Sequence, residues 1–199
     1  MARKTQLAER FIWSGNKLLT SGEIRPTNVV PVIASNKEGK GTVFPMKWGF
    51  TIRRGDEYTG SSTLIVNARS ETAAEKPTFK EPWQQHRCII PASWYFEWEH
   101  FKNAEGKTKT GDKFAIQPSG ASAAWLCGLY RMEGKFPAFT ILTKEPSQSV
   151  REIHDRMPLM LPKEAIRAWI DPKSDPAKLL PYALSEMVME RVETADGAK

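Results

Sequence analysis

Short apolar runs separated by turn-forming residues constrain the fold of this chain more than any other feature. The runs are rich in β-branched and aromatic residues, as is typical of strands, and none is long enough to span a bilayer. Strands are predicted over residues 29–34, 42–50, 64–66, 87–90, 94–100, 113–117, 124–130 and 136–143. Many short strands with few helices indicate an α+β fold.

Helical patterns lie between and after these strands. Helices are predicted over residues 6–19, in part over 71–85, where two prolines interrupt, and over 162–170 and 175–189, with a helical turn at 147–154. The polar, glycine-containing segment 53–62 is predicted to be an exposed loop, and segment 101–112 a hydrophilic hairpin loop. Because no internal repeat or domain boundary is visible, residues 1–199 are expected to form a single domain.

Composition excludes several classes of protein. The 40% hydrophobic and 26% charged residues are ordinary for a globular chain, and no apolar segment follows the basic N-terminus to form a secretory signal. The two cysteines, Cys88 and Cys127, lie in apolar surroundings, which predicts buried, reduced thiols in a cytoplasmic protein. No cysteine or histidine pair has ligand spacing, so no metal or other cofactor is expected. The net charge of +6 permits phosphate binding.

One predicted strand combines carboxylates with bulky rings. Alternation places its side chains on two faces, with Trp94, Phe96 and Trp98 on one and Tyr95, Glu97 and Glu99 on the other. A carboxylate that is desolvated beside such rings has a raised pKa and suits acid–base chemistry, for which Glu97 is the candidate. The alternative is that Glu97 and Glu99 mark the solvated face of an edge strand, and Glu99 is expected to be solvated.

Two further polar groups stand out. His154, next to Asp155 on a loop before Pro158, is a candidate general acid or base, or else an exposed histidine beside a capping aspartate. Asn67 and Arg69 stand two residues apart at the end of a predicted strand, so their side chains share a side. Such a pair can hold a phosphate or a sugar, or it can simply stabilise the loop. The residues alone leave these alternatives open.

Seven motifs together resemble the SRAP family, the SOS-response-associated peptidases. In order they are PTNVVPV (26–32), MKWGF (46–50), VNARSET (66–72), PTFK (77–80), RCIIPASWYFEW (87–98), FTILT (139–143) and IHDRMPLML (153–161). The resemblance covers nearly all of residues 22–171. It implies a barrel-like, mostly antiparallel β-sheet core with peripheral helices.

The resemblance also implies a function and a set of site residues. Family members bind single-stranded DNA at abasic sites and form a covalent crosslink through an N-terminal cysteine, whose amine and thiol close a thiazolidine on the lesion. By similarity, the catalytic residues are Asn67, Glu97 and His154, and the DNA-binding residues are Asn28, Pro31, Arg69, Thr143 and Arg156. Trp48 is expected to pack in the core. The implied protein is a monomer with no membrane association.

Two other functions are compatible with the resemblance. The first is a peptidase that acts autocatalytically on its own initiator methionine, and the second is a non-catalytic DNA-binding module. The retained Asn67, Glu97 and His154 argue mildly against the second, since a binding module has no evident need for all three.

The chain departs from the family pattern in three places. It begins Met1-Ala2-Arg3-Lys4, so the N-terminal cysteine is missing, the first strand of the domain is expected to be missing as well, and the chain is expected not to crosslink. The loop after Phe50 lacks the tryptophans that some members carry there. The ending MVMERVETADGAK departs from the usual closing strand of the family, so the C-terminus is expected to be diverged or truncated. Cys88 and Cys127 cannot replace the cysteine, because their nitrogens are in amide bonds.

Overall fold

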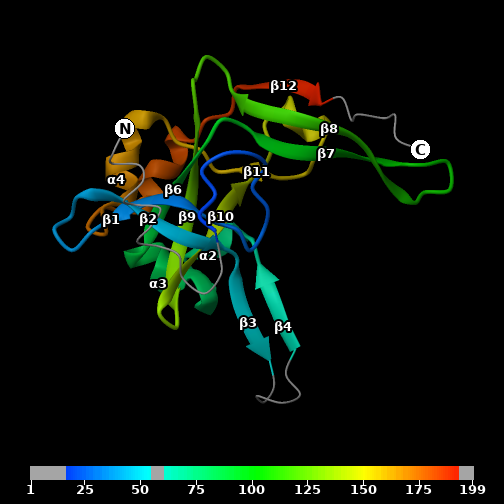
Figure 1. Ribbon diagram of the computed structural model, residues 1–199. Helices are drawn as coiled ribbons and strands as arrows, with labels where there is room; N and C mark the ends of the chain where they lie inside the picture. Colours follow the sequence, from blue (N-terminus) through cyan, green and yellow to red (C-terminus); the bar gives the residue numbers. More distant parts are fainter. Residues whose placement is uncertain (1–16, 55–60, 193–199) are drawn as a thin grey trace.

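A five-stranded closed barrel forms the centre of the protein in a computed structural model that describes residues 17–54 and 61–192 (Figure 1). The barrel strands, in spatial order, are β10 (Phe136–Lys144), β2 (Gly41–Trp48), β1 (Val29–Ser35), β6 (Arg87–Ala92) and β9 (Ala124–Glu133), which pairs back with β10. The β10–β2 pair is parallel and the other four pairs are antiparallel. The expected α+β fold with a barrel-like, mostly antiparallel core is thus confirmed.

Further strands extend the barrel. Two short strands, β5 (Asn67–Arg69) and β11 (Met157–Pro158), both pair with β10. A separate sheet contains β12 (Met187–Val192), β8 (Thr108–Pro118) and β7 (Tyr95–Lys102), and a two-stranded ribbon contains β3 (Phe50–Arg54) and β4 (Ser61–Ile65). Figure 1 shows this ribbon and the turn end of β7 and β8 projecting from the body in different directions.

Helices are short and lie at the periphery. They are α2 (Ser70–Ala73), α3 (Pro77–Gln85) and α4 (Ile166–Ile170), with 3₁₀ turns η1 (Val150–Glu152), η2 (Lys163–Ala165) and η3 (Pro176–Tyr182). Pro77 occupies the first turn of α3, where a missing N–H costs little, and the helix continues through Pro82. Among the described residues, no helix combines the length and apolar character needed to cross a membrane.

Alternate side chains of the barrel strands enter two hydrophobic clusters. On β1, Val30, Val32 and Ala34 join a cluster that also takes Ile116 of β8, while Ile33 packs against the other. The second cluster joins the barrel to α3 and α4, which contribute Phe79, Trp83, Trp169 and Ile170. The rings of Trp83 and Trp169 meet edge to face at 6.0 Å. The first cluster therefore holds the three-stranded sheet on the barrel, and the second holds the helices.

Arg87 links the barrel to the helices through hydrogen bonds that the sequence did not indicate. Its side chain is buried, with 1% of the residue exposed, and it has no carboxylate partner among the described residues. Instead the guanidinium donates to five backbone carbonyls, those of Trp83, Gln84, Trp169, Asp171 and Ser174, at 2.5–3.0 Å. The carbonyls belong to the end of α3, the end of α4 and the loop that follows. One side chain thus provides hydrogen-bond donors for the free backbone carbonyls at two helix ends.

The C-terminal prediction was wrong. The expected helix over 175–189 is replaced by η3, which ends at Tyr182, and by the strand β12. Pro181 has no N–H to continue a helical ladder, and residues 187–192 pair with β8 along their whole length. The diverged ending thus still forms a strand over Met187–Val192.

Parts of two predicted loops are strands. Residues 53–54 and 61–62 extend β3 and β4, whereas residues 55–60 lie outside the described part. Residues 101–102 and 108–112 extend the β7–β8 hairpin, whose turn is held by the Asn103 side chain, an acceptor for the backbone N–H groups of Glu105 and Lys107. Both pairs of strands project into solvent, so both faces carry polar residues. This polar composition resembles that of a loop. The helix expected over 6–19 falls mostly outside the described residues.

Replacing Arg87 with Met should lower the free energy of unfolding by about 3–5 kcal/mol, because several buried carbonyls lose their donor and each costs about 1–3 kcal/mol. Arg191→Met is the matched control, since Arg191 is 67% exposed and pairs with Asp112 on the surface, and it should cost less than about 1 kcal/mol. Urea unfolding of both variants measures the difference. Equal losses would contradict the assignment.

Candidate active site

Strand pairing around β10 brings several of the predicted site residues together. Asn67 lies opposite Ile141 in the parallel β5–β10 pair, and Arg69 lies opposite Thr143. On the other edge of β10, Thr143 lies opposite Pro158 in β11. The segment 154–158, which carries His154 and Arg156, therefore leads into β11 on one edge of β10, while β5 with Asn67 and Arg69 lies on the other edge.

Glu97 and His154 face each other across the junction between β7 and this segment. The Glu97 Oε1 atom lies 3.9 Å from the His154 Nε2 atom. The Nδ1 atom of His154 lies 3.1 Å from both the backbone N and the backbone O of Arg156, and 3.3 Å from an Asp155 oxygen. The ring is therefore held from one side by the backbone and presents its other nitrogen to the Glu97 carboxylate.

Burial prepares Glu97 for acid–base chemistry. Desolvation raises the pKa of Glu97 above its usual range, and the positive charges of His154 and His100 offset part of this effect. Tyr95, on the same face of β7, is buried, and burial also raises the pKa of its hydroxyl. A carboxyl with a raised pKa next to an imidazole can hold or pass a proton near neutral pH.

The inward face of β7 is the one that carries Tyr95 and Glu97. The aromatic face is the exposed one, with Trp94 50% and Trp98 40% exposed and Lys113 lying 3.9 Å above the Phe96 ring. The alternative that Glu97 marks a solvated face is therefore wrong. Glu99 is also half-buried, against Gly111 of the neighbouring strand, so the expectation that it is solvated is wrong as well.

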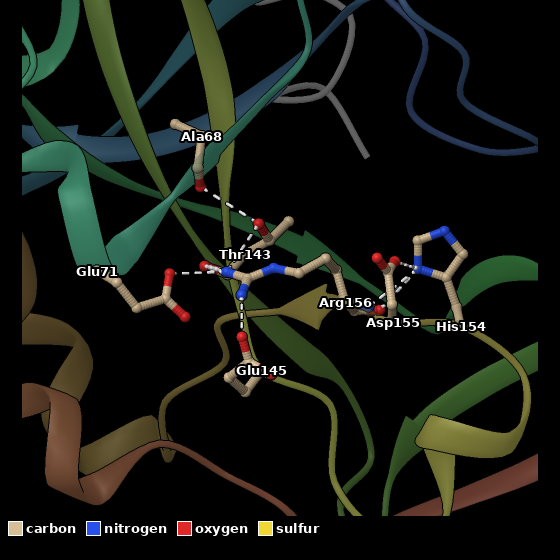
Figure 2. A network of polar contacts seen from close by, with 7 residues as sticks. All are labelled: Ala68, Glu71, Thr143, Glu145, His154, Asp155 and Arg156. Atoms are coloured by element: carbon tan, nitrogen blue, oxygen red, sulfur yellow. Dashed lines mark hydrogen bonds and ion pairs between the residues drawn. The ribbon is translucent and has the colours of Figure 1, made fainter.

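Arg156 is the centre of a polar network that joins the site segments (Figure 2). Its Nη2 atom donates to Glu71 at 2.7 Å and to the backbone carbonyl of Thr143 at 2.8 Å, and its Nη1 atom donates to Glu145 at 2.9 Å. The Thr143 hydroxyl in turn donates to the carbonyl of Ala68. Arg156 thus fastens the His154 segment to β10 and to the start of α2, and a DNA phosphate would have to compete with two carboxylates for its guanidinium.

Asn28 and Pro31 lie on the neighbouring part of the barrel. The Asn28 side chain accepts a hydrogen bond from the backbone N–H of Arg25 and so closes the turn before β1. The backbone carbonyl of Asn28 accepts a hydrogen bond from the backbone N–H of Trp48. The indole N–H of Trp48 donates to the backbone carbonyl of Val66, directly before Asn67. Pro31 lies in β1 opposite Pro45 and is half-buried. Asn28 is therefore linked to β5 through Trp48, while the strand pairing places Pro31 only within the barrel wall.

The packing of Trp48 agrees with the sequence expectation. Its ring stacks on that of Phe139 at 6.3 Å, and it packs against the first hydrophobic cluster. The cysteines are likewise buried: Cys88 and Cys127 are both 0% exposed, free, and have thiol pKa values raised by burial. Neither thiol can reach a substrate as a nucleophile. In the part of the chain that the structure describes, no group of three His, Cys, Asp or Glu side chains is placed to hold a metal ion.

His100 is an exposed residue that lies beside His154, a contact that the sequence did not indicate. Its ring centroid lies 5.4 Å from that of His154. Simple alternation along β7 puts His100 on the aromatic face with Trp98, but the pairing of β7 with β8 shifts register between these two residues. No signal in the sequence reveals this irregularity.

Comparison with known proteins agrees with the motifs. The family model described as SOS response associated peptidase (SRAP) matches residues 1–196. The chain is 34% identical over 200 residues to the abasic site processing protein YobE of Bacillus subtilis, covering 90% of this chain and 86% of that protein. It is 32% identical over 133 residues to the abasic site processing protein YedK of Escherichia coli, covering 63% and 54% of the two chains.

Solved structures share the fold. A protein from Bacteroides thetaiotaomicron has a TM-score of 0.67 at 24% identity, covering 84% of this chain and 75% of that one. A phage-related protein from Bordetella bronchiseptica has a TM-score of 0.67 at 20% identity, covering 93% and 88%. The barrel with its attached sheet is therefore a fold that distant sequences also adopt.

Glu97→Gln should stabilise the protein at neutral pH. Because the pKa of Glu97 is raised on folding, the ionised carboxylate is disfavoured in the folded state, and this penalty grows as the pH rises through the folded pKa. Below the unfolded value of about 4.3 both states are protonated and the penalty vanishes. The Tm difference between variant and wild type should therefore be positive at pH 7 and shrink toward pH 4. Glu99→Gln controls for the loss of one negative charge on the same strand, and a difference independent of pH would contradict the argument.

Proposed function

The chain belongs to the SRAP family, and from this membership we propose that it processes abasic sites in single-stranded DNA. The observation that carries the proposal is the Glu97–His154 pair, in which a desolvated carboxylate lies 3.9 Å from an imidazole. The strand β11 that follows His154 pairs with β10, and so does β5, which holds Asn67 and Arg69. Relatives at 32–34% identity that carry the name abasic site processing protein support it.

The proposed chemistry needs an acid and a base at one carbon. An amine adds to the aldehyde carbon of the ring-opened abasic sugar, and the resulting carbinolamine loses one water to become an imine. Formation of the carbinolamine requires proton removal from the amine, and loss of water requires proton donation to the hydroxyl. We assign these transfers to Glu97 and His154, and assign to Asn67 the positioning of the sugar.

DNA contact in this proposal comes from Arg69. Arg69 is exposed at the end of β5 and has no carboxylate partner among the described residues. It can therefore bind a phosphate without breaking an ion pair, in contrast to Arg156. An abasic site offers no base to read, so contacts to sugar and phosphate suit this substrate.

We propose that a stable crosslink uses an N-terminal cysteine. Its amine forms the imine, and its thiol adds to the imine carbon to close a thiazolidine, with no atoms gained or lost in the ring closure. Cys88 and Cys127 cannot take this role because both are buried and their nitrogens lie in the backbone. Peptide cleavage, which the family description names, is proposed only as removal of an initiator methionine, the step that frees such an amine.

We further propose that residues 1–199 act as one domain, in a monomer, in the cytoplasm. The match of one family model to residues 1–196 supports the single domain. The two buried free cysteines are compatible with a reducing compartment.

Covalent capture should depend on the N-terminal residue. Incubated with single-stranded DNA containing one abasic site, the 199-residue chain should bind on a native gel but give no heat-stable band on a denaturing gel. The same chain preceded by Met-Cys-Gly-Arg should give the band, since it supplies both amine and thiol. A heat-stable band from the first chain, or none from the second despite binding, would contradict the proposed nucleophile.

Glu97→Gln and His154→Ala should separate chemistry from binding. In the cysteine-bearing chain, each change should slow crosslinking by about 10²–10⁴-fold, the usual contribution of a general acid or base. Affinity for DNA with a tetrahydrofuran abasic analogue, which has no aldehyde, should change little. Gel time courses and fluorescence anisotropy measure the two quantities. A non-catalytic DNA-binding module would instead show unchanged values in both assays.

A further inference from the structure

The surface beside His154 contains a hollow of about 380 Å³. It is lined by His100, Arg151, Ile153, His154 and Asp155. This volume is at the lower end of the roughly 300–1,000 Å³ typical of ligand pockets, so it suits a small group rather than a whole nucleotide chain. Because His154 forms part of its wall, the hollow adjoins the Glu97–His154 pair.

The residues around the hollow are fixed by the fold. Arg151 lies in η1, whose neighbours Val150 and Ile153 are 0% and 6% exposed and anchor the turn in the first hydrophobic cluster. The backbone N–H of His100 donates to the carbonyl of Ile153 at 3.2 Å, which ties β7 to this turn. The hollow is thus built from two elements that are hydrogen-bonded to each other.

The charges in the hollow favour an anion. Arg151 has no carboxylate partner within the described residues, whereas Arg156 has two. The ring of His100 offers a further N–H donor on the same wall. The opposing charge is Asp155, whose carboxylate is 85% exposed and lies 3.3 Å from the His154 Nδ1 atom. An unpaired guanidinium that lines the same hollow as the His100 imidazole is a suitable environment for a phosphate oxygen.

We infer that this hollow binds the phosphodiester next to the abasic sugar, with Arg151 and His100 as its ligands. The inference rests on the proposed function, because it assigns the neighbouring phosphate of the same DNA strand. The sugar that reacts lies at the Glu97–His154 pair, and the phosphate next to this sugar in the strand lies in the hollow. Arg151 and His100 then set the position of the lesion along the strand and take no part in the proton transfers.

The test measures binding of single-stranded oligonucleotides that carry one tetrahydrofuran abasic analogue. Arg151→Ala should weaken binding by about ten-fold, and His100→Asn by less, because one charge-assisted contact is lost in the first case. The slope of log affinity against log salt should fall by about 0.7 for Arg151→Ala, the value for one phosphate contact on a single strand. Arg167→Ala, which removes an exposed arginine from α4, is the matched control and should change neither quantity.

A neutral methylphosphonate at the linkage 5′ or 3′ of the analogue identifies the phosphate. At one of the two positions, wild-type protein should lose about ten-fold in affinity, while Arg151→Ala should lose nothing further, because the contact is already absent. Asp155→Asn should tighten binding to the unmodified strand, since it removes the negative charge from the hollow.

The outcomes separate the inference from the proposed function. If wild type prefers the abasic strand but Arg151→Ala binds like Arg167→Ala, the hollow does not hold a phosphate and the proposed function stands. If Arg151→Ala is weaker but equally sensitive to methylphosphonate at both flanking linkages, its contact is elsewhere on the strand and the inference is overturned. If wild type shows no preference for the abasic strand, the proposed function fails and the inference fails with it.

Discussion

Pairing along β10 is the constraint on which both the barrel and the site depend. This strand is bonded to β2 and β9, which closes the barrel, and near its end to β5 and β11, which carry the site. Its residues 138–143 are all buried, so the register cannot slip without moving apolar side chains to the wrong face. The same register that buries Phe139 and Leu142 sets Arg69 opposite Thr143. Site geometry is in this sense a by-product of barrel closure.

The strands of the fold could be predicted from the sequence better than the individual side-chain contacts. The apolar runs gave the barrel strands because β-branched residues at alternate positions suit a pleated, half-buried surface. Alternation also sorted residues 94–99 into two faces, but it could not say which face is inward, and here the aromatic face with Trp94 and Trp98 is the exposed one. Two features had no local signal at all. Arg87 is held by carbonyls of the preceding helix and of residues 169–174, which are distant in the sequence, and the pairing of β7 with β8 is irregular where His100 approaches His154.

The candidate site was found through resemblance and motif more than through physical pattern. Asn67 and Arg69 are predicted to act as a pair because they stand two positions apart on a strand, and the structure keeps both on β5. Glu97 and His154 are far apart in the chain, and only the fold brings them to 3.9 Å. The helix expected over 175–189 does not form, because contacts distant in the sequence override the local pattern. Its local pattern fits a helix, but the free edge of β8 offers residues 187–192 a full set of backbone partners.

The arginines near the site divide into two kinds by their partners. Arg156 is neutralised by Glu71 and Glu145 and bonds a backbone carbonyl, so breaking these contacts to reach a phosphate would cost much of what binding gains. Arg69 and Arg151 have no acidic partner in the described part of the chain, so a phosphate gives them a first counter-charge. Arg69 lies on β5, and Arg151 lies on η1, where it lines the same hollow as His154. An anionic strand would therefore gain most by contacting these two arginines, while Arg156 holds the His154 segment in place.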